Sequence, residues 1–284
     1  MNGGLRAAAL AVAVLCALAR AGTAAPDEAA PRRPRVVVDP GHGGSNSGAS
    51  GIVAGAVEKE MTLILARKLR DQLVARGIDV ELTRDGDRTL ILRQRVALAN
   101  RTRADAFISI HTNASMSRAQ RGFETFVLTP AGLDIDGRAL RADDGALRPG
   151  VDPAIARVLD DVERGAALPR AADLAAAIQA QLAAVRGRDL DRGVRQDAHH
   201  VLLGATMPAV LVEVGFLDHP LEGRELVDPG LQDRIAIAIA TAIAAQLGAA
   251  SCSVPGCVPT EDVPTSSARS RSSPTGRSTP RARR

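Results

Sequence analysis

The chain has 284 residues, 45% of them hydrophobic, which is enough for one well-filled α/β domain with tails. It contains no Trp or Tyr and only four Phe, which argues against an aromatic platform for stacking sugar rings. The formal net charge of +4 comes partly from a basic C-terminal tail. We expect no nucleic-acid partner, because the N-terminus predicts export.

The N-terminal residues 1–25 have the pattern of a secretory signal peptide. Arg6 precedes an apolar run over residues 7–18, and small residues close the segment. We predict cleavage at its end, which leaves residues 26–34 as a charged, proline-rich lead-in. A membrane anchor is the weaker alternative, because the apolar run is short and Arg20 follows it. We expect a periplasmic protein with no transmembrane segment after cleavage.

The predicted elements between the tails alternate strictly at first, in the order strand, helix, strand, helix, strand. The predicted strands are residues 36–38, 78–83, 107–110, 123–128 and 209–212, and the predicted helices are residues 58–77, 90–103, 171–185 and 231–247. The strands are rich in β-branched and apolar residues, and leucines recur at helical spacing in the first helix. This order predicts a single α/β domain over residues 35–250, with a mainly parallel sheet and helices on both faces.

Residues 129–170 interrupt this alternation, because they form a segment longer than a normal connection between elements. Long insertions beside the ligand-binding edge of a sheet often act as lids. The alternative is an ordinary surface insertion.

The C-terminal residues 251–284 are rich in Ser, Thr, Pro and Arg and contain few apolar side chains. We expect this tail to be disordered. It is either a solvated linker or a basic arm that holds the protein near anionic envelope polymers. Cys252 and Cys257 lie at its start, and such a pair in an exported protein more often forms a disulfide than a metal site.

Three predicted strands end in a reactive side chain. The first strand runs into a glycine turn around His42, the third ends at His111, and the strand of residues 209–212 ends at Glu213. Open α/β sheets bind ligands at the carboxyl ends of their strands. Glu58, at the start of the first long helix, is placed to join these side chains.

Two imidazoles and one carboxylate suit zinc, with a fourth position left to water as in catalytic sites. His42, Glu58 and His111 are therefore the candidate zinc ligands, and Glu213 is the candidate general base for hydrolysis of an amide. Glu60 competes with Glu58 because it is only two residues away. The structural alternatives are that Glu58 is a helix N-terminal charge and that Glu213 is half of an ion pair.

The remaining histidines are His199, His200 and His219. We interpret them as surface or cleft residues rather than metal ligands. His200 directly precedes the apolar residues 201–203, which would bring it within reach of a substrate.

Several stretches of the sequence carry a resemblance to a known family. They are VDPGHGG (38–44), EKE (58–60), TR (83–84), ADAFISIHTNA (104–114), GFE (122–124) and MPAVLVEVGFL (207–217). In this order, and covering residues 35–247, they resemble zinc-dependent N-acetylmuramoyl-L-alanine amidases of the cell-wall amidase type 3 family.

The resemblance implies that His42, Glu58 and His111 bind zinc and that Glu213 is the catalytic glutamate. It implies peptidoglycan as the substrate, cleaved at the amide between the lactyl group of N-acetylmuramic acid and the L-alanine of the stem peptide. Asn113 matches a position near the zinc histidine, where a supporting residue would orient the ring.

The resemblance extends to the long segment. Division amidases of this family carry a regulatory helix, and residues 151–163 are similar to it in position and pattern. The resemblance implies that residues 129–170 are an autoinhibitory lid, with Glu163 or a neighbouring acid close to zinc, displaced by an activator with a coiled coil and a LytM-like domain. The chain departs from the family at Asn46, where an acid is common, and at Asp218 and His219.

Two other functions compete with this interpretation. A zinc peptidase acting on cell-wall peptides would use the same chemistry, and a non-catalytic wall-binding protein would need none. The presence of His42, Glu58, His111 and Glu213 argues against a protein that has lost catalysis. We expect a monomer, since nothing in the sequence indicates an interface.

Overall fold

The computed structural model describes residues 32–129 and 150–249. The chain divides into two compact units after Arg33, and the description that follows concerns the second. The predicted signal peptide, the basic tail and the Cys252 and Cys257 pair lie outside the described residues, as do residues 130–149 of the predicted insertion. Among the described helices, none has the length and apolar character needed to cross a membrane.

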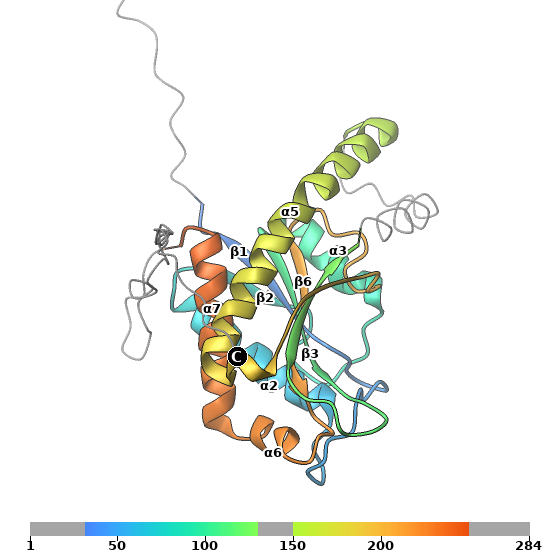
Figure 1. The fold of residues 1–284 in the computed structure, drawn as a ribbon. Coiled ribbons are helices and arrows are strands. Elements are labelled where there is room, and N and C mark those ends of the chain that lie inside the picture. Colours follow the sequence, from blue (N-terminus) through green and yellow to red (C-terminus); the bar gives the residue numbers. More distant parts are fainter. Residues whose placement is uncertain (1–31, 130–149, 250–284) are drawn as a thin grey trace, which may run out of the picture. The chain divides into compact units, whose positions relative to one another are not determined.

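One six-stranded sheet forms the centre of the domain, with the order β2-β1-β3-β6-β4-β5 (Figure 1). The strands are β1 (Arg35–Pro40), β2 (Asp79–Leu82), β3 (Ala106–Asn113), β4 (Phe123–Leu128), β5 (Asp191–Asp197) and β6 (Ala209–Phe216). All neighbours pair in parallel except β4 and β6, which are antiparallel. The predicted single α/β domain with a mainly parallel sheet is confirmed.

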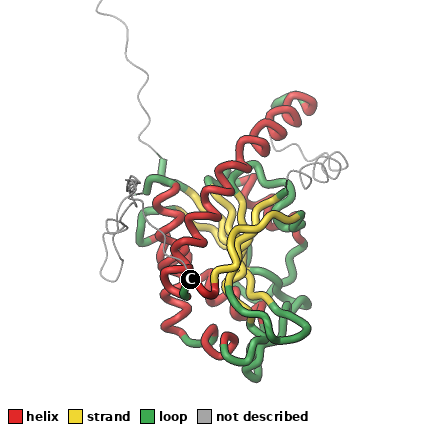
Figure 2. Tube along the Cα trace, viewed as in Figure 1, coloured by secondary structure: helices red, strands yellow, loops and turns green. Residues whose placement is uncertain are grey.

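Helices cover the sheet on both faces (Figure 2). They are α2 (Glu58–Val74), α3 (Leu92–Arg101), α5 (Pro153–Arg186), α6 (Glu222–Leu226) and α7 (Pro229–Gln246), with a short 3₁₀ turn η1 (Arg188–Leu190). Side chains alternate along each strand. Val36 and Val38 therefore pack with α2, α5 and α7, whereas Val37, Phe107 and Leu211 pack with α3.

Three features of the second half differ from the expectations. The residues of β5 were predicted to be a polar turn, but they form an edge strand whose side chains are mostly exposed. The short helix α6 was not predicted. The helix expected at residues 171–185 is much longer, because α5 starts at Pro153, is capped by Asp152 and continues through Pro169.

The predicted insertion follows β4. The last residue of β4 lies at the end of the sheet opposite the carboxyl ends of β1, β3 and β6. Because β4 is antiparallel to β6, its last residue, Leu128, lies towards the start of β6 and away from Glu213. The first part of α5 extends past the sheet in Figure 1, and Glu163 is exposed on it. A lid formed by this segment stays a prediction. To cover the site, the segment would have to return along the sheet to the carboxyl ends of β1, β3 and β6.

Candidate active site

The turn after β1 brings His42 against His111. His42 has a positive φ of 59°, and the Gly41 amide donates to the Ile110 carbonyl of β3 at 3.0 Å. A Cβ at Gly41 would lie 2.4 Å from ring atoms of His111, so no other residue type fits here. The two imidazole rings meet edge to face, with centroids 4.9 Å apart.

Two buried arginines, Arg84 and Arg95, donate hydrogen bonds to the backbone carbonyls of this turn. The Arg84 guanidinium donates to the carbonyls of Pro40 and Gly41 at 3.0 and 2.7 Å. Arg95 donates to the carbonyls of Pro40 and His42 at 2.9 and 2.7 Å. The turn lacks the regular hydrogen bonds of a strand or helix, so these side chains satisfy its carbonyls and fix its shape.

A buried ion pair anchors Arg95 in turn. Its Nη1 lies 2.7 Å from Oδ1 of Asp39, which has no exposed surface. The Ser109 hydroxyl donates to the other oxygen of Asp39 at 2.8 Å. The strand β1 therefore carries, one residue before Pro40, the carboxylate that positions the His42 turn.

Replacing Arg95 by Met should lower the free energy of unfolding by about 3 to 5 kcal/mol, because the buried Asp39 would lose its direct ion-pair partner. Urea denaturation followed by circular dichroism measures this change. The matched control is Arg70→Ala, which breaks surface pairs with Asp71 and Asp85 and should cost less than about 1 kcal/mol. Equal losses of unfolding free energy in the two variants would show that the buried pair stabilises the fold no more than an exposed pair does.

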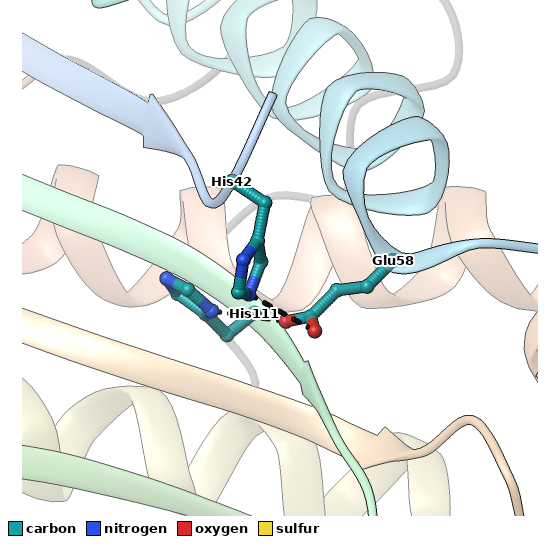
Figure 3. A group of neighbouring side chains, drawn as sticks. All are labelled: His42, Glu58 and His111. Carbon is teal, nitrogen blue, oxygen red and sulfur yellow. Dashed lines mark hydrogen bonds and ion pairs between the residues drawn. The ribbon is translucent and has the colours of Figure 1, made fainter. Parts of the chain in front are cut away.

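Glu58, the first residue of α2, bridges the two histidines (Figure 3). Its Oε2 lies 3.0 Å from His42 Nε2, and its Oε1 lies 2.9 Å from His111 Nδ1. The backbone amides of Ala49 and Thr112 also donate to this carboxylate, at 2.8 and 3.1 Å. Burial by itself would raise the pKa of Glu58, but the hydrogen bonds from His111 and His42 outweigh it and hold the pKa far below its ordinary value.

These three side chains meet the requirements of a metal site. One donor atom from each of His42, Glu58 and His111 lies within 4.8 Å of the others. Across the described ranges 32–129 and 150–249, no second cluster of three or more such side chains is found. Glu60, the competing carboxylate, is exposed and lies outside the group.

The surroundings of the site also suit a cation bound by imidazole and carboxylate ligands. Burial lowers the pKa of His111, but the hydrogen bond to Glu58 and the nearby charge of Glu213 raise it above its ordinary value overall, so the site favours positive charge. The Nδ1 atom of His42 is held 3.0 Å from Oδ1 of Asn46. Asn46 thus keeps an oxygen acceptor beside His42, as a residue that supports a metal ligand would.

Glu213 lies directly beside His111 in the sheet. It is opposite His111 in the register of β3 and β6, and opposite Glu124 in the register of β6 and β4. Burial raises the pKa of Glu213 to about 7. Its Oε2 is buried and forms no hydrogen bond with any of the described residues. The side chain is therefore ready to accept and release a proton near neutral pH.

A second charged cluster surrounds Glu124, and no pattern in the sequence indicated it. Glu124 is buried and contacts Arg192 and Arg195 of β5 through Oε2, at 3.2 and 2.8 Å. Asn113 donates to its Oε1 at 2.9 Å. The expectation that Asn113 orients the neighbouring histidine is therefore wrong, because its amide turns to β4 and its carbonyl oxygen accepts from Ala114.

The other histidines stay apart from the metal-binding group. His199 is partly buried, with its ring 4.5 Å from that of Phe126, and burial lowers its pKa. His200 is exposed. His219 accepts hydrogen bonds from the amides of Leu221 and Glu222 at the start of α6. All three agree with the interpretation as surface or cleft residues.

Comparison with known proteins identifies the family of this chain. The model of a family described as N-acetylmuramoyl-L-alanine amidase matches residues 36–245. The chain belongs to this amidase family. Its enzyme class is that of an N-acetylmuramoyl-L-alanine amidase, which acts on the cell wall.

Individual relatives agree with the family assignment. The amidase is 33% identical to the N-acetylmuramoyl-L-alanine amidase AmiA of Escherichia coli K12 over 216 residues, which are 73% of this chain and 74% of AmiA. The solved structure of AmiC2 from Nostoc punctiforme matches with a TM-score of 0.58 and 28% identity, covering 76% of this chain and 97% of AmiC2. The catalytic domain of CwlV from Bacillus (Paenibacillus) polymyxa var. colistinus matches with a TM-score of 0.54 and 32% identity. The match covers 76% of this chain and 99% of the CwlV domain.

Proposed function

We propose that this amidase is a zinc-dependent peptidoglycan hydrolase that cleaves the amide between the lactyl group of N-acetylmuramic acid and the L-alanine of the stem peptide. One observation carries the proposal. His42, Glu58 and His111 meet at the carboxyl edge of the sheet with Glu213 on the next strand, in a chain that belongs to the amidase family.

In this proposal His42, Glu58 and His111 hold the zinc ion. When bound, zinc supplies electrophilic stabilisation of the carbonyl oxygen and makes water in the site more acidic. Asn46 fixes the orientation of His42 from its far ring nitrogen. Arg84 and Arg95 keep the His42 turn in the shape that the site needs.

Glu213 moves the proton. Its carboxylate takes a proton from the water that attacks the lactyl carbonyl, and it then delivers that proton to the departing nitrogen of L-alanine. Burial raises the pKa of the Glu213 carboxyl above its ordinary value, which makes the carboxylate a stronger base for accepting the proton. Its unpartnered, buried Oε2 is the atom available for this transfer.

The remaining parts of the chain follow from their sequence patterns. We infer that residues 1–25 direct export and are removed, that the mature monomer works in the periplasm, and that residues 251–284 form a basic arm. We also propose that residues 129–170 act as an autoinhibitory lid that a coiled-coil and LytM-like activator releases. A chain lacking residues 129–170, assayed beside the full mature chain, tests the lid: we expect a gain of activity, and unchanged activity would contradict the lid.

Product analysis tests the main proposal. The mature chain is incubated with purified peptidoglycan and Zn²⁺, and the soluble products are identified by mass spectrometry. We expect intact stem peptides with a free L-alanine amine, lost on addition of a chelator and restored by Zn²⁺. Shortened peptides still attached to glycan would instead identify a zinc peptidase. Absence of products from the full chain and from the chain lacking residues 129–170 would favour a non-catalytic wall-binding protein.

A further inference from the structure

The cluster around Glu124 lies next to the proposed catalytic residues and has no part in the chemistry described above. Glu124 and Glu213 are direct partners in an antiparallel pair, so their side chains share one face of the sheet with Cβ atoms about 5 Å apart. Crossing the sheet from the metal group, the order is His111, Glu213, Glu124 and then β5. The cluster is thus one strand beyond the general base.

The cluster carries an excess of positive charge. Two guanidinium groups, those of Arg192 and Arg195, share the single carboxylate of Glu124. Asn113 supplies the other oxygen of Glu124 with a neutral donor. The group of Arg192, Arg195 and Glu124 therefore has a formal charge of +1, and Arg195 lies on the edge strand with half of its side chain exposed.

The two arginines are held differently. Arg192 lies over the ring of Phe216, with its Cζ 5.0 Å from the centroid, and its side chain is 27% exposed. The side chain of Arg195 is 50% exposed and contacts Glu124 through Nε. In the part of the chain that the structure describes, no hydrogen bond occupies its two Nη atoms. Glu124 therefore orients Arg195 and leaves its outer donors open to solvent.

The position of Arg195 indicates which end of the substrate it meets. In the proposed mechanism, the metal-binding group lies on the carbonyl side of the scissile amide, and Glu213 lies on the side of the leaving nitrogen, to which it delivers the proton. The chain that begins at that nitrogen is the stem peptide, and the next strands in that direction are β4 and β5. A guanidinium with two free donors forms a fork that matches a carboxylate.

We propose that Arg195, oriented by Glu124, binds a carboxylate of the stem peptide on the leaving-group side of the scissile amide. This inference rests on the proposed function, since it takes the direction of the substrate from the role of Glu213. It makes Arg195 a residue that sets specificity for acidic stem peptides, with Arg192 and Asn113 keeping Glu124 in place.

The test uses two soluble substrates that differ only in charge. They are N-acetylmuramoyl-L-alanyl-D-glutamate and the same compound with both carboxylates converted to amides. The wild-type enzyme should hydrolyse the acidic compound with a kcat/KM about 10- to 100-fold higher, the value of a charge-assisted hydrogen bond. Arg195→Gln should lose this preference by slowing the acidic substrate alone, and Arg195→Lys should recover part of it.

The control is Arg224→Gln, which removes an exposed arginine of α6 and should leave the preference unchanged. Equal losses on the two substrates would assign Arg195 a structural role and overturn the inference, as would no loss on either. If the wild-type enzyme hydrolysed both compounds without preference, the inference would fail while the proposed function stood.

If neither compound were hydrolysed by any form, the proposed function would be in question and binding would decide the inference. Calorimetry with zinc-loaded full-length Glu213→Gln protein compares the affinities of the two compounds directly. Stronger binding of the acidic compound that disappears in the Arg195→Gln background supports the carboxylate site, and equal affinities overturn it.

Discussion

Glu213→Gln should reduce kcat for peptidoglycan by about 10²- to 10⁴-fold, because the amide cannot accept the proton that the carboxylate takes from water. The substitution keeps the shape of the side chain, and Glu213 is not a member of the metal-binding group. Bound zinc, measured by mass spectrometry of the native protein, should therefore stay equal to that of the wild type. Activity close to the wild-type value in a zinc-loaded variant would remove Glu213 from the mechanism.

The same variant tests whether burial disfavours the ionised form of Glu213. Burial raises the pKa of Glu213 from about 4.5 to about 7 in the folded, metal-free protein. Below pH 4.5 the group is protonated in both the folded and the unfolded chain, and its contribution to stability is complete. As the pH rises through 7, that contribution is lost, because the unfolded chain ionises more easily.

Metal-free wild type should therefore lose up to about 3 kcal/mol of unfolding free energy relative to Glu213→Gln between pH 4.5 and pH 8. Urea denaturation of both proteins in the presence of a chelator, at several pH values, measures the difference. A difference that does not change with pH would mean that Glu213 titrates normally.

Glu58→Gln should weaken zinc binding by at least about 100-fold and remove activity in proportion. The amide loses the negative charge that faces two histidines, and its NH₂ group would oppose the amide donors of Ala49 and Thr112. Such a change exceeds the 10- to 100-fold effect expected of residues that only support metal ligands. Competition with a zinc chelator of known affinity measures the constant.

Glu60→Gln is the matched control, since Glu60 lies two residues after Glu58 in the first turn of α2 and is exposed. It should bind zinc as the wild type does. The opposite result, with zinc lost in Glu60→Gln and kept in Glu58→Gln, would reverse the assignment of the carboxylate ligand.

The sequence was sufficient to predict that His42, His111 and Glu213 lie near one another. Each follows a short apolar run, and the carboxyl ends of parallel strands meet at one edge of the sheet. The fold class followed from the same runs, because their alternation with helical segments leaves few arrangements other than a covered parallel sheet.

The choice between Glu58 and Glu60 depended on three-dimensional structure. The two residues are about 200° apart around a helix with 3.6 residues per turn, so only one can face the histidines. The sequence shows their spacing, but the direction of each depends on how α2 packs against the sheet. Asn113 illustrates the same limit, because its partner Glu124 is on another strand.

The strand β5 and its arginines could not be recognised from the sequence. An edge strand with mostly exposed side chains has no apolar alternation, and its residues, DRGVRQD, resemble a polar turn. Pairing with β4 is what makes this segment a strand and brings Arg192 and Arg195 to Glu124. Local runs of apolar residues thus indicated the metal-binding and catalytic candidates. Contacts between segments that are distant in the sequence decided which other residues lie around them.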